Sequence, residues 1–345
     1  MFIYQIHLYV KLVIILYKLI LCRMGGLIII KVLFTLKLQE EEYDKIRNLG
    51  YEVIFNSEGR KSTLDKMTQD ELDSIDVLVT YNCFNRLDIS KMKNLKFIQL
   101  GSVGFDQVPK DKLINRDIIL SNNKGGYSIP MAEWIVLNIL QIYKNTHKFY
   151  INQSNKIWRP DNTILDVYGK RIGFLGTGTI AMEAAKRLKA FGVEIWGCNT
   201  DGRNIKYFDK CVAKEGINDI FKECDVVVST MPATKKTEKI INKEKFELMK
   251  NNSVFINVGR GKVVDEQGLI ECASKFKGVA LDVFEEEPLS ESSPLWDMEN
   301  IIITPHNSWV SQQNSLRSFN LFYNNLKKFM ENKEPSNIVK ISKGY

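Results

Sequence analysis

Histidine is scarce in this 345-residue sequence, which holds only His7, His147 and His306. So few imidazoles exclude a histidine-rich metal centre, and any histidine chemistry must use one of these three side chains. The six cysteines are far apart, with no C-x-x-C pair and no histidine beside them. This pattern does not support a disulfide framework or a zinc motif, and it is typical of reduced thiols in a cytoplasmic protein. We therefore expect no bound metal.

The sequence also lacks any dense cluster of one charge. Its net charge is +7, but the lysines are spread along the chain and no aromatic-basic motif appears. We therefore expect a solvated basic surface and no nucleic-acid partner. Because a domain averages about 150 residues, the length predicts two domains, each large enough to bury its own core.

The first 23 residues contain no uninterrupted apolar run of membrane-spanning length. Lys11 and Lys18 break the run, and a lysine near the centre of a spanning helix costs roughly 2.5 to 3.5 kcal/mol. Together with His7 they would share one helical face, which leaves an interfacial membrane helix open. The alternative is that Met24 is the true start. We expect residues 1–23 to lie outside the fold.

A glycine turn between an apolar run and an alanine-rich run is the strongest local motif. Ile172–Leu175 leads into Gly176, Thr177 and Gly178, and a helix is predicted over Thr179–Phe191. Strand, tight turn and helix in this order are typical of dinucleotide binding, with the pyrophosphate at the helix N-terminus. Gly176, Thr177, Gly178, Thr179 and Ile180 are therefore candidate cofactor contacts. A plain structural turn is the alternative.

Alternating apolar runs and helical segments predict parallel sheets covered by helices. A helix is expected over Glu40–Leu49, and Ser121–Gly126 is a cluster of turn formers typical of a hinge. The predicted strands are Leu27–Phe34, Tyr51–Phe55, Val77–Thr80, Phe97–Leu100, Ile118–Leu120, Val193–Gly197, Asp225–Thr230, Ser253–Val258, Gly278–Phe284 and Ile301–Thr304.

Two long helices are also predicted, one between the two groups of strands and one after the last strand. One begins at Ser128, as its cap, and runs to about Lys148; it is apolar nearly all round, so it must be buried between domains or between subunits. The other runs from about Ser311 to Glu331. Its apolar residues recur at spacings of three and four and predict a core stripe of Leu316, Phe319, Phe322, Leu326 and Phe329.

Three polar residues follow successive predicted strands. Arg260 stands between glycines, Glu287 precedes Pro288, and His306 follows Pro305. Singly, they could be a surface arginine, a solvated carboxylate and a histidine that satisfies loop carbonyls. Because ligands bind at the carboxyl ends of strands in doubly wound sheets, their joint placement favours a catalytic site.

At these motifs the sequence resembles the D-isomer-specific 2-hydroxyacid dehydrogenases, from Lys31 to about Val339. The resemblance rests on six blocks in family order: residues 176–181, Asn257–Asp265, Ala280–Pro288, Thr304–His306, Gly101–Asp106 and Met131–Glu133. It implies two doubly wound parallel-sheet domains, a Rossmann dinucleotide-binding domain inserted in a flavodoxin-like substrate domain. The expected bounds are 24–126 plus 307–345 for the substrate domain and 127–306 for the NAD(P) domain.

The resemblance also implies catalytic roles. Arg260 would clamp the substrate's carboxylate and 2-oxo oxygen. His306 would be the general acid and base, and Glu287 would hold the other imidazole nitrogen. Glu285 and Glu286 are rivals of Glu287 by sequence.

Further contacts follow from the same resemblance. Backbone N–H groups around Ser102, Val103 and Gly104 would bind the substrate carboxylate as a nest, and Tyr81 with Asn82 would meet its variable group; a plain turn and an unliganded loop are the alternatives. Three more residues are expected to contact the cofactor: Thr230, Val258 and Asp282.

The choice of cofactor depends on the end of the second dinucleotide-domain strand. NAD enzymes place Asp or Glu there to bind the ribose 2′-OH, but this chain has the uncharged Asn199. Arg203 could neutralise a 2′-phosphate, with Asn199 and Thr200 donating hydrogen bonds, which favours NADP over NAD. Alternatively, Asp201 turns inward and restores NAD binding, or Arg203 faces water.

Taken together, the sequence predicts an enzyme that reversibly reduces a small 2-oxo acid to a D-2-hydroxy acid with NAD(P)H. The resemblance implies a homodimer joined through the helix at 128–148. The alternative from another class is a dinucleotide-sensing corepressor or scaffold of the same fold. The joint presence of Arg260, Glu287 and His306 favours the enzyme.

Overall fold

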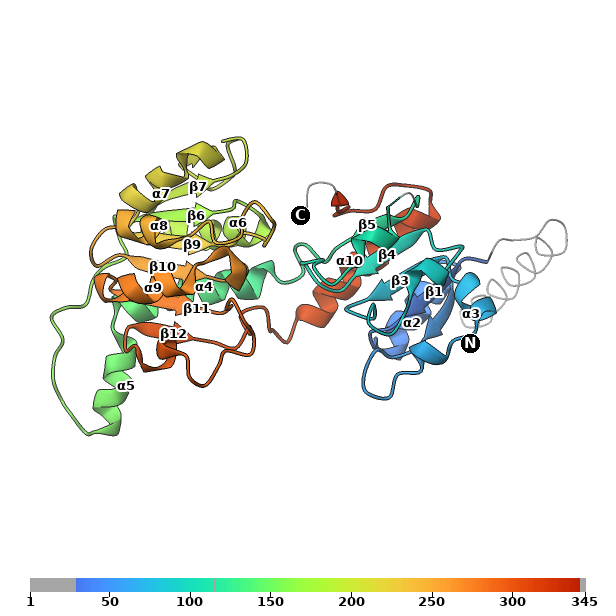
Figure 1. Cartoon of the computed structure of the whole chain (residues 1–345), viewed down its shortest axis with the longest axis horizontal. Helices are drawn as coiled ribbons and strands as arrows, with labels where there is room; N and C mark the ends of the chain where they lie inside the picture. The colour runs from blue at the N-terminus through green and yellow to red at the C-terminus, as the bar shows by residue number, and fades with distance from the viewer. Residues whose placement is uncertain (1–28, 115, 342–345) are drawn as a thin grey trace, which may run out of the picture. The chain divides into compact units, whose positions relative to one another are not determined.

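The computed structural model describes residues 29–114 and 116–341 (Figure 1). The chain forms two compact units. The first runs up to Gly101 and takes in Gln107–Ser121 and Phe322–Ile338. The second comprises Ser102–Asp106, Asn122–Leu321 and the residues from Val339. The expected membrane-facing or untranslated segment 1–23 lies outside the described residues.

The first unit holds a five-stranded, fully parallel sheet in the order β2-β1-β3-β4-β5. This is the 2-1-3-4-5 order of flavodoxin-like folds. The sheet confirms the five runs predicted in this part of the chain, although β1 begins only at Lys31 and the start of the predicted run Leu27–Phe34 lies outside the described residues. Its strands are β1 (Lys31–Phe34), β2 (Glu52–Phe55), β3 (Val77–Thr80), β4 (Phe97–Leu100) and β5 (Ile119–Ser121).

The second unit holds a seven-stranded parallel sheet in the order β12-β11-β10-β9-β6-β7-β8. Counted from β6 as the first strand, this is the Rossmann order 3-2-1-4-5-6 with one strand added. The sequence did not predict β8. The strands are β6 (Arg171–Leu175), β7 (Glu194–Cys198), β8 (Lys210–Val212), β9 (Val226–Ser229), β10 (Val254–Asn257), β11 (Gly278–Leu281) and β12 (Ile301–Ile303).

Helices flank both sheets (Figure 1). The glycine-turn helix α6 is extended by a 3-10 turn at Lys189–Phe191. The α-helices are α2 (Glu40–Asn48), α3 (Gln69–Asp73), α4 (Ser128–Tyr143), α5 (Thr146–Ser154), α6 (Thr179–Leu188), α7 (Ile217–Glu223), α8 (Lys243–Leu248), α9 (Glu266–Cys272) and α10 (Asn314–Met330).

The prediction of a single helix from Ser128 to Lys148 is wrong, because the helix is interrupted between α4 and α5. Asn145 adopts a left-handed conformation with φ of 48°, which ends the regular helix. Its side-chain amide donates to Asp161 at 3.0 Å and to Thr163 at 2.9 Å. These bonds support the left-handed residue, and α5 starts in a new direction. Ser128 is also not the cap: it is the first helical residue and donates to the Thr179 hydroxyl.

Two apolar cores cover the faces of the seven-stranded sheet. One joins α4 and α6 to Ile172 and Phe174 of β6. The other joins α7, α8 and α9 to Leu175 of the same strand. Because successive side chains of a strand point to opposite faces, both faces must be apolar, and these strands are almost continuously hydrophobic.

The predicted core stripe of the last helix is correct except at its first position. Phe319, Phe322 and Leu326 are buried, and Phe329 stacks on Phe97 with ring centroids 5.3 Å apart. Leu316 is 59% exposed, so its place in the stripe was wrong. It lies in the first turn of α10.

Within residues 29–114 and 116–341, no helix has the length and apolarity needed to cross a membrane.

Candidate active site

The glycine turn lies between β6 and α6 and is shaped to receive a phosphate. Gly176 has φ of +90°, a conformation that residues with a side chain rarely adopt. The Thr230 hydroxyl donates to the carbonyls of Leu175 at 3.3 Å and Gly176 at 3.1 Å, which holds the turn from the neighbouring strand β9. A Cβ built on Gly178 would meet no atom within 4 Å. The helix starts without a side-chain cap, so its first N–H groups fit an anion.

The other predicted cofactor contacts near the glycine turn differ in how exposed their side chains are. The side chains of Thr177 and Val258 are buried, and the Val258 N–H donates to the Ser229 carbonyl at 3.1 Å. Thr179 and Ile180 are partly exposed in the first turn of α6. The structure therefore leaves the main chain of this turn, more than its side chains, available to a phosphate.

The loop after β7, which is predicted to choose between NAD and NADP, is held by hydrogen bonds among its own residues. The Asn199 amide donates to the Arg203 carbonyl at 2.9 Å, and its oxygen accepts from the Asp201 N–H at 3.3 Å. The Arg203 guanidinium lies 2.6 Å from the Asp201 carboxylate, and both side chains are more than half exposed. Asp201 is thus paired with Arg203 and does not turn inward. Thr200 lies in the same loop and is exposed.

Arg260 follows β10 on a turn that two glycines make possible. A Cβ on Gly261 would lie 1.7 Å from the Phe284 carbonyl oxygen, and one on Gly259 would lie 2.5 Å from that of Met231. The Asn257 side chain bonds both the Gly259 N–H and the Arg260 carbonyl, at 3.1 Å each. This fixes the Arg260 main chain at the carboxyl end of the sheet.

The segment Ser102–Gly104 belongs to the same unit as Arg260. All three of its carbonyls accept hydrogen bonds: from the Asn123 N–H at 2.9 Å, the Asn122 amide at 2.8 Å and the Ser102 hydroxyl at 2.6 Å. Among the described residues, no group accepts from the N–H groups of Val103 and Gly104. Tyr81, in the five-stranded unit, is 43% exposed at the end of β3, and its carbonyl accepts from Gln107.

His306 and Glu287 are in direct contact. The Nδ1 atom of His306 lies 2.8 Å from the Glu287 carboxylate, and both side chains are partly exposed. Of the two rivals, Glu285 is engaged elsewhere: it pairs with Lys239 at 2.9 Å and accepts from the Glu266 N–H. Glu286 makes no ion pair with His306. The sequence favoured Glu287 only by its match to the family motif, and the contact with His306 separates it from its two neighbours.

Asp282 has a role that sequence reasoning missed. It is fully buried, and its carboxylate accepts from the Thr304 hydroxyl and from the N–H groups of Asn307 and Ser308, at 2.5 to 3.1 Å. These bonds hold the turn on which His306 lies with φ of 51°. Whether an aspartate side chain is buried, and which groups it accepts hydrogen bonds from, cannot be inferred from its place in a motif.

Trp309 also supports the His306 turn and was not predicted. Its indole N–H donates to the His306 carbonyl at 2.9 Å, and its ring packs on Tyr127 with centroids 5.2 Å apart. A tryptophan three residues after the histidine was the available signal.

Residues 136–308 match the family described as D-isomer specific 2-hydroxyacid dehydrogenase, NAD binding domain. The chain belongs to this family. Membership makes it an NAD(P)-dependent oxidoreductase acting on a CH–OH group. This confirms the family, the fold class and the enzyme class expected from the sequence.

Relatives of known name agree with this assignment. A glyoxylate reductase from Thermofilum pendens is 31% identical over 261 residues, which cover 71% of this chain and 75% of that protein. A D-3-phosphoglycerate dehydrogenase from Methanocaldococcus jannaschii is 29% identical over 322 residues, 90% of this chain. The match spans only 59% of that longer protein.

Solved structures of the family share the fold. The NADPH-dependent glyoxylate/hydroxypyruvate reductase of Sinorhizobium meliloti, in complex with NADP and sulfate, has a TM-score of 0.73 and 26% identity over 92% of this chain and 100% of that one. A D-isomer specific 2-hydroxyacid dehydrogenase from Xanthobacter autotrophicus, in complex with NADPH, has a TM-score of 0.77 over 91% and 99% of the two chains. At 22% identity, the second likeness concerns the fold alone.

Proposed function

We propose that this dehydrogenase reversibly reduces a small 2-oxo acid to the D-2-hydroxy acid, with His306 as general acid and base, Glu287 as its partner and Arg260 as the substrate clamp. The contact of 2.8 Å between Nδ1 of His306 and the Glu287 carboxylate carries the proposal. A carboxylate only accepts hydrogen bonds, so Nδ1 bears a proton and Nε2 is the atom that exchanges one with the substrate oxygen.

In the direction of reduction, the steps assigned to the chain are binding, orientation and proton transfer. Arg260 and the N–H groups of Val103 and Gly104, which have no acceptor among the described residues, would bind the carboxylate. His306 would donate its Nε2 proton to the 2-oxo oxygen as it becomes a hydroxyl, and the Glu287 carboxylate would keep the ring in orientation throughout. The bound nicotinamide supplies the hydride.

We infer that the cofactor is NADP(H) in preference to NAD(H). The position that carries an acid in NAD enzymes holds Asn199, and its side chain is used within the loop. The Arg203 side chain is more than half exposed, and among the described residues its one ion pair is with the neighbouring Asp201, so a 2′-phosphate could compete for it.

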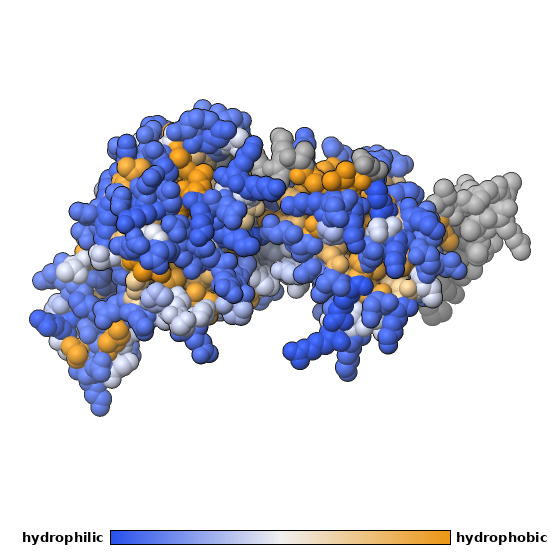
Figure 2. All heavy atoms as spheres, in the orientation of Figure 1, coloured by the Kyte–Doolittle hydropathy of each residue, from blue (hydrophilic) through white to orange (hydrophobic). Residues whose placement is uncertain are grey.

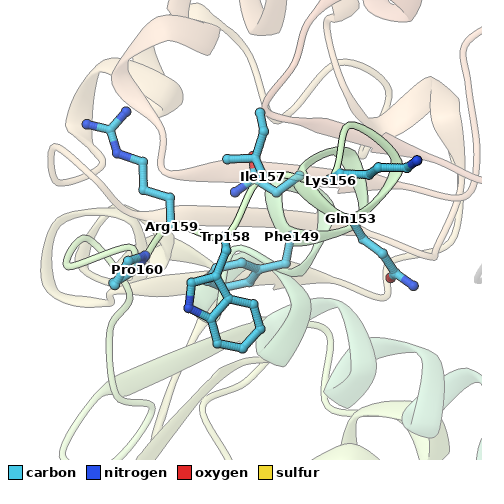
Figure 3. A pocket seen from close by; sticks show the side chains of 8 residues that line it. Phe149, Gln153, Lys156, Ile157, Trp158, Arg159 and Pro160 are labelled. Atoms are coloured by element: carbon cyan, nitrogen blue, oxygen red, sulfur yellow. The ribbon is translucent and has the colours of Figure 1, made fainter.

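We also propose a homodimer, formed by α4 and the arm of α5 with the loop after it. Leu137 of α4 is half exposed, and the arm exposes Phe149, Tyr150, Ile151, Ile157 and Trp158. Figure 1 shows α5 extending away from the seven-stranded sheet, and Figure 2 shows hydrophobic surface on this arm. A hollow of about 530 Å³ on this arm is lined by apolar and polar side chains, among them Phe149, Ile157 and the fully exposed Trp158 (Figure 3). Several large apolar side chains exposed on one arm are typical of an interface.

The test of the activity is a turnover assay of the purified protein with NADPH and NADH. The substrates are glyoxylate, hydroxypyruvate, pyruvate, longer 2-oxo acids and 3-phosphohydroxypyruvate, and the product's configuration is determined by chiral chromatography. We expect turnover with at least one of them and a D product. Tight cofactor binding without turnover of any 2-oxo acid would instead favour the corepressor or scaffold.

A further inference from the structure

Asp106 makes an ion pair with Arg260 that lies within a single unit of the protein. Its Oδ2 atom is 3.4 Å from the Arg260 Nε, and among the described residues no other carboxylate lies within ion-pair distance of that guanidinium. The one further hydrogen bond of the guanidinium within the described part of the chain runs from NH1 to the Gly259 carbonyl, at 2.8 Å. The contact therefore does not depend on any residue of the five-stranded unit.

Gly104 leaves room for the third nitrogen of the Arg260 guanidinium, NH2. A Cβ on Gly104 would be 1.9 Å from NH2 of Arg260 and 3.1 Å from both its Cζ and the Asp106 carboxylate. The guanidinium therefore lies directly against the Gly104 main chain, with Asp106 on its Nε edge. Of its three nitrogens, only NH2 has no acceptor among the described residues.

We propose that Asp106 is a positioning residue that holds the Arg260 guanidinium with NH2 toward the substrate carboxylate, and that its charge selects monoanionic over dianionic 2-oxo acids. The first part follows from geometry, because a long arginine side chain samples many rotamers unless its nitrogens are held. The second follows from charge. The Arg260–Asp106 pair is neutral, one substrate carboxylate makes the group of three anionic, and a second acidic group on the substrate adds repulsion.

The inference rests on the proposed role of Arg260, so the experiment includes a measurement that needs no turnover. Four variants are compared with the wild type: Asp106→Ala, Asp106→Asn, and the matched controls Asp297→Ala and Asp297→Asn, which alter an exposed carboxylate of the same unit. Steady-state kinetics are measured with pyruvate as the monoanion and oxaloacetate as the dianion. Calorimetry with the NADPH-loaded protein measures the affinity for oxamate, an unreactive monoanionic analogue.

We expect Asp106→Ala to lower kcat/KM for pyruvate by roughly tenfold to a hundredfold and to weaken oxamate binding in proportion, since small misplacements of a clamp are costly. The affinity for NADPH should change less than about twofold, because Asp106 makes no contact with the glycine turn. Asp106→Asn keeps an acceptor for Nε, so it should retain most activity with pyruvate while the ratio of kcat/KM for oxaloacetate to that for pyruvate rises at least about fivefold.

The outcomes separate the two proposals. An Asp106→Ala enzyme with wild-type kinetics and oxamate affinity would overturn the positioning role, and an unchanged oxaloacetate-to-pyruvate ratio in Asp106→Asn would overturn the charge selection. A wild type without turnover that still binds oxamate in an Asp106-dependent way would overturn the proposed activity and support the inference. A wild type that neither turns over 2-oxo acids nor binds oxamate would overturn both.

Discussion

The carboxylate of Glu287 lies 2.8 Å from Nδ1 of His306, although the two residues are 19 positions apart in the chain. The strands β11 and β12 are hydrogen-bonded neighbours, and the loops that follow them carry the two side chains. The pairing of the strands thus creates the contact.

Replacing His306 by Asn should lower the rate of 2-oxo acid reduction by roughly 10² to 10⁴, because positioned proton transfer is lost. Glu287→Gln should lower it by up to about a hundredfold, since the ring loses its orientation. Glu286→Gln is the matched control and should be close to wild type. The measurement is kcat at saturating cofactor. Additive losses in the double variant of His306 and Glu287 would contradict their joint action.

Gly104→Ala should displace the Arg260 side chain while leaving the arginine itself in place. The added methyl would lie 1.9 Å from NH2 of Arg260, so the guanidinium must move away. We expect a fall in kcat/KM of roughly a hundredfold. Gly59→Ala controls for the substitution itself, because its Cβ would meet only the flexible Ser57 hydroxyl at 3.3 Å. Full activity of Gly104→Ala, at unchanged Tm, would refute this placement of the arginine.

Arg203→Ala should raise the KM for NADPH about tenfold or more and leave the KM for NADH unchanged, because a charge-assisted bond to the 2′-phosphate is lost. Asp201→Ala should lower the KM for NADPH by up to about fivefold, since it releases Arg203 from an exposed ion pair. Arg86→Ala, at an exposed arginine of the other unit, is the control. An NADPH preference that survives Arg203→Ala would show that selectivity arises elsewhere.

Trp158→Ala should weaken the homodimer about tenfold or more, because a fully exposed tryptophan is a strong candidate for an interface anchor. Trp296→Ala, also at an exposed tryptophan, should leave association unchanged. Sedimentation equilibrium over a range of protein concentrations measures the effect. A monomeric wild type, or equal association of both variants, would argue against the arm as the interface.

Asp282→Asn should destabilise the His306 turn while keeping the size of the side chain. The amide turns one acceptor into a donor among buried N–H groups, and each unsatisfied group costs about 1 to 3 kcal/mol. We expect a lower free energy of unfolding in urea together with a lower kcat. Asp297→Asn, at an exposed position, should alter neither. A stable Asp282→Asn protein with normal kcat would contradict this role of the buried carboxylate.

Most strands were predictable because buried parallel strands are short apolar runs with turn formers at their ends. β8 was missed because it is an edge strand of only three residues, Lys210–Val212, none of them buried, and a run this short gives no such signal. The break between α4 and α5 was missed for a different reason. Asn145 lies inside a helical pattern, and its left-handed conformation depends on Asp161 and Thr163, which come later in the chain.

The sequence by itself determined the family and the two parallel sheets, and it singled out Arg260, Glu287 and His306 as candidate catalytic residues, because motifs at strand ends and apolar periodicity are local properties. Only the tertiary structure decided which of three adjacent glutamates contacts His306, that Asp282 is buried beneath the histidine turn, and that Asp106 and Gly104 lie against the Arg260 guanidinium. Each of these depends on side-chain direction across elements far apart in sequence. Strand order and packing fix such directions, and spacing along the chain does not reveal them.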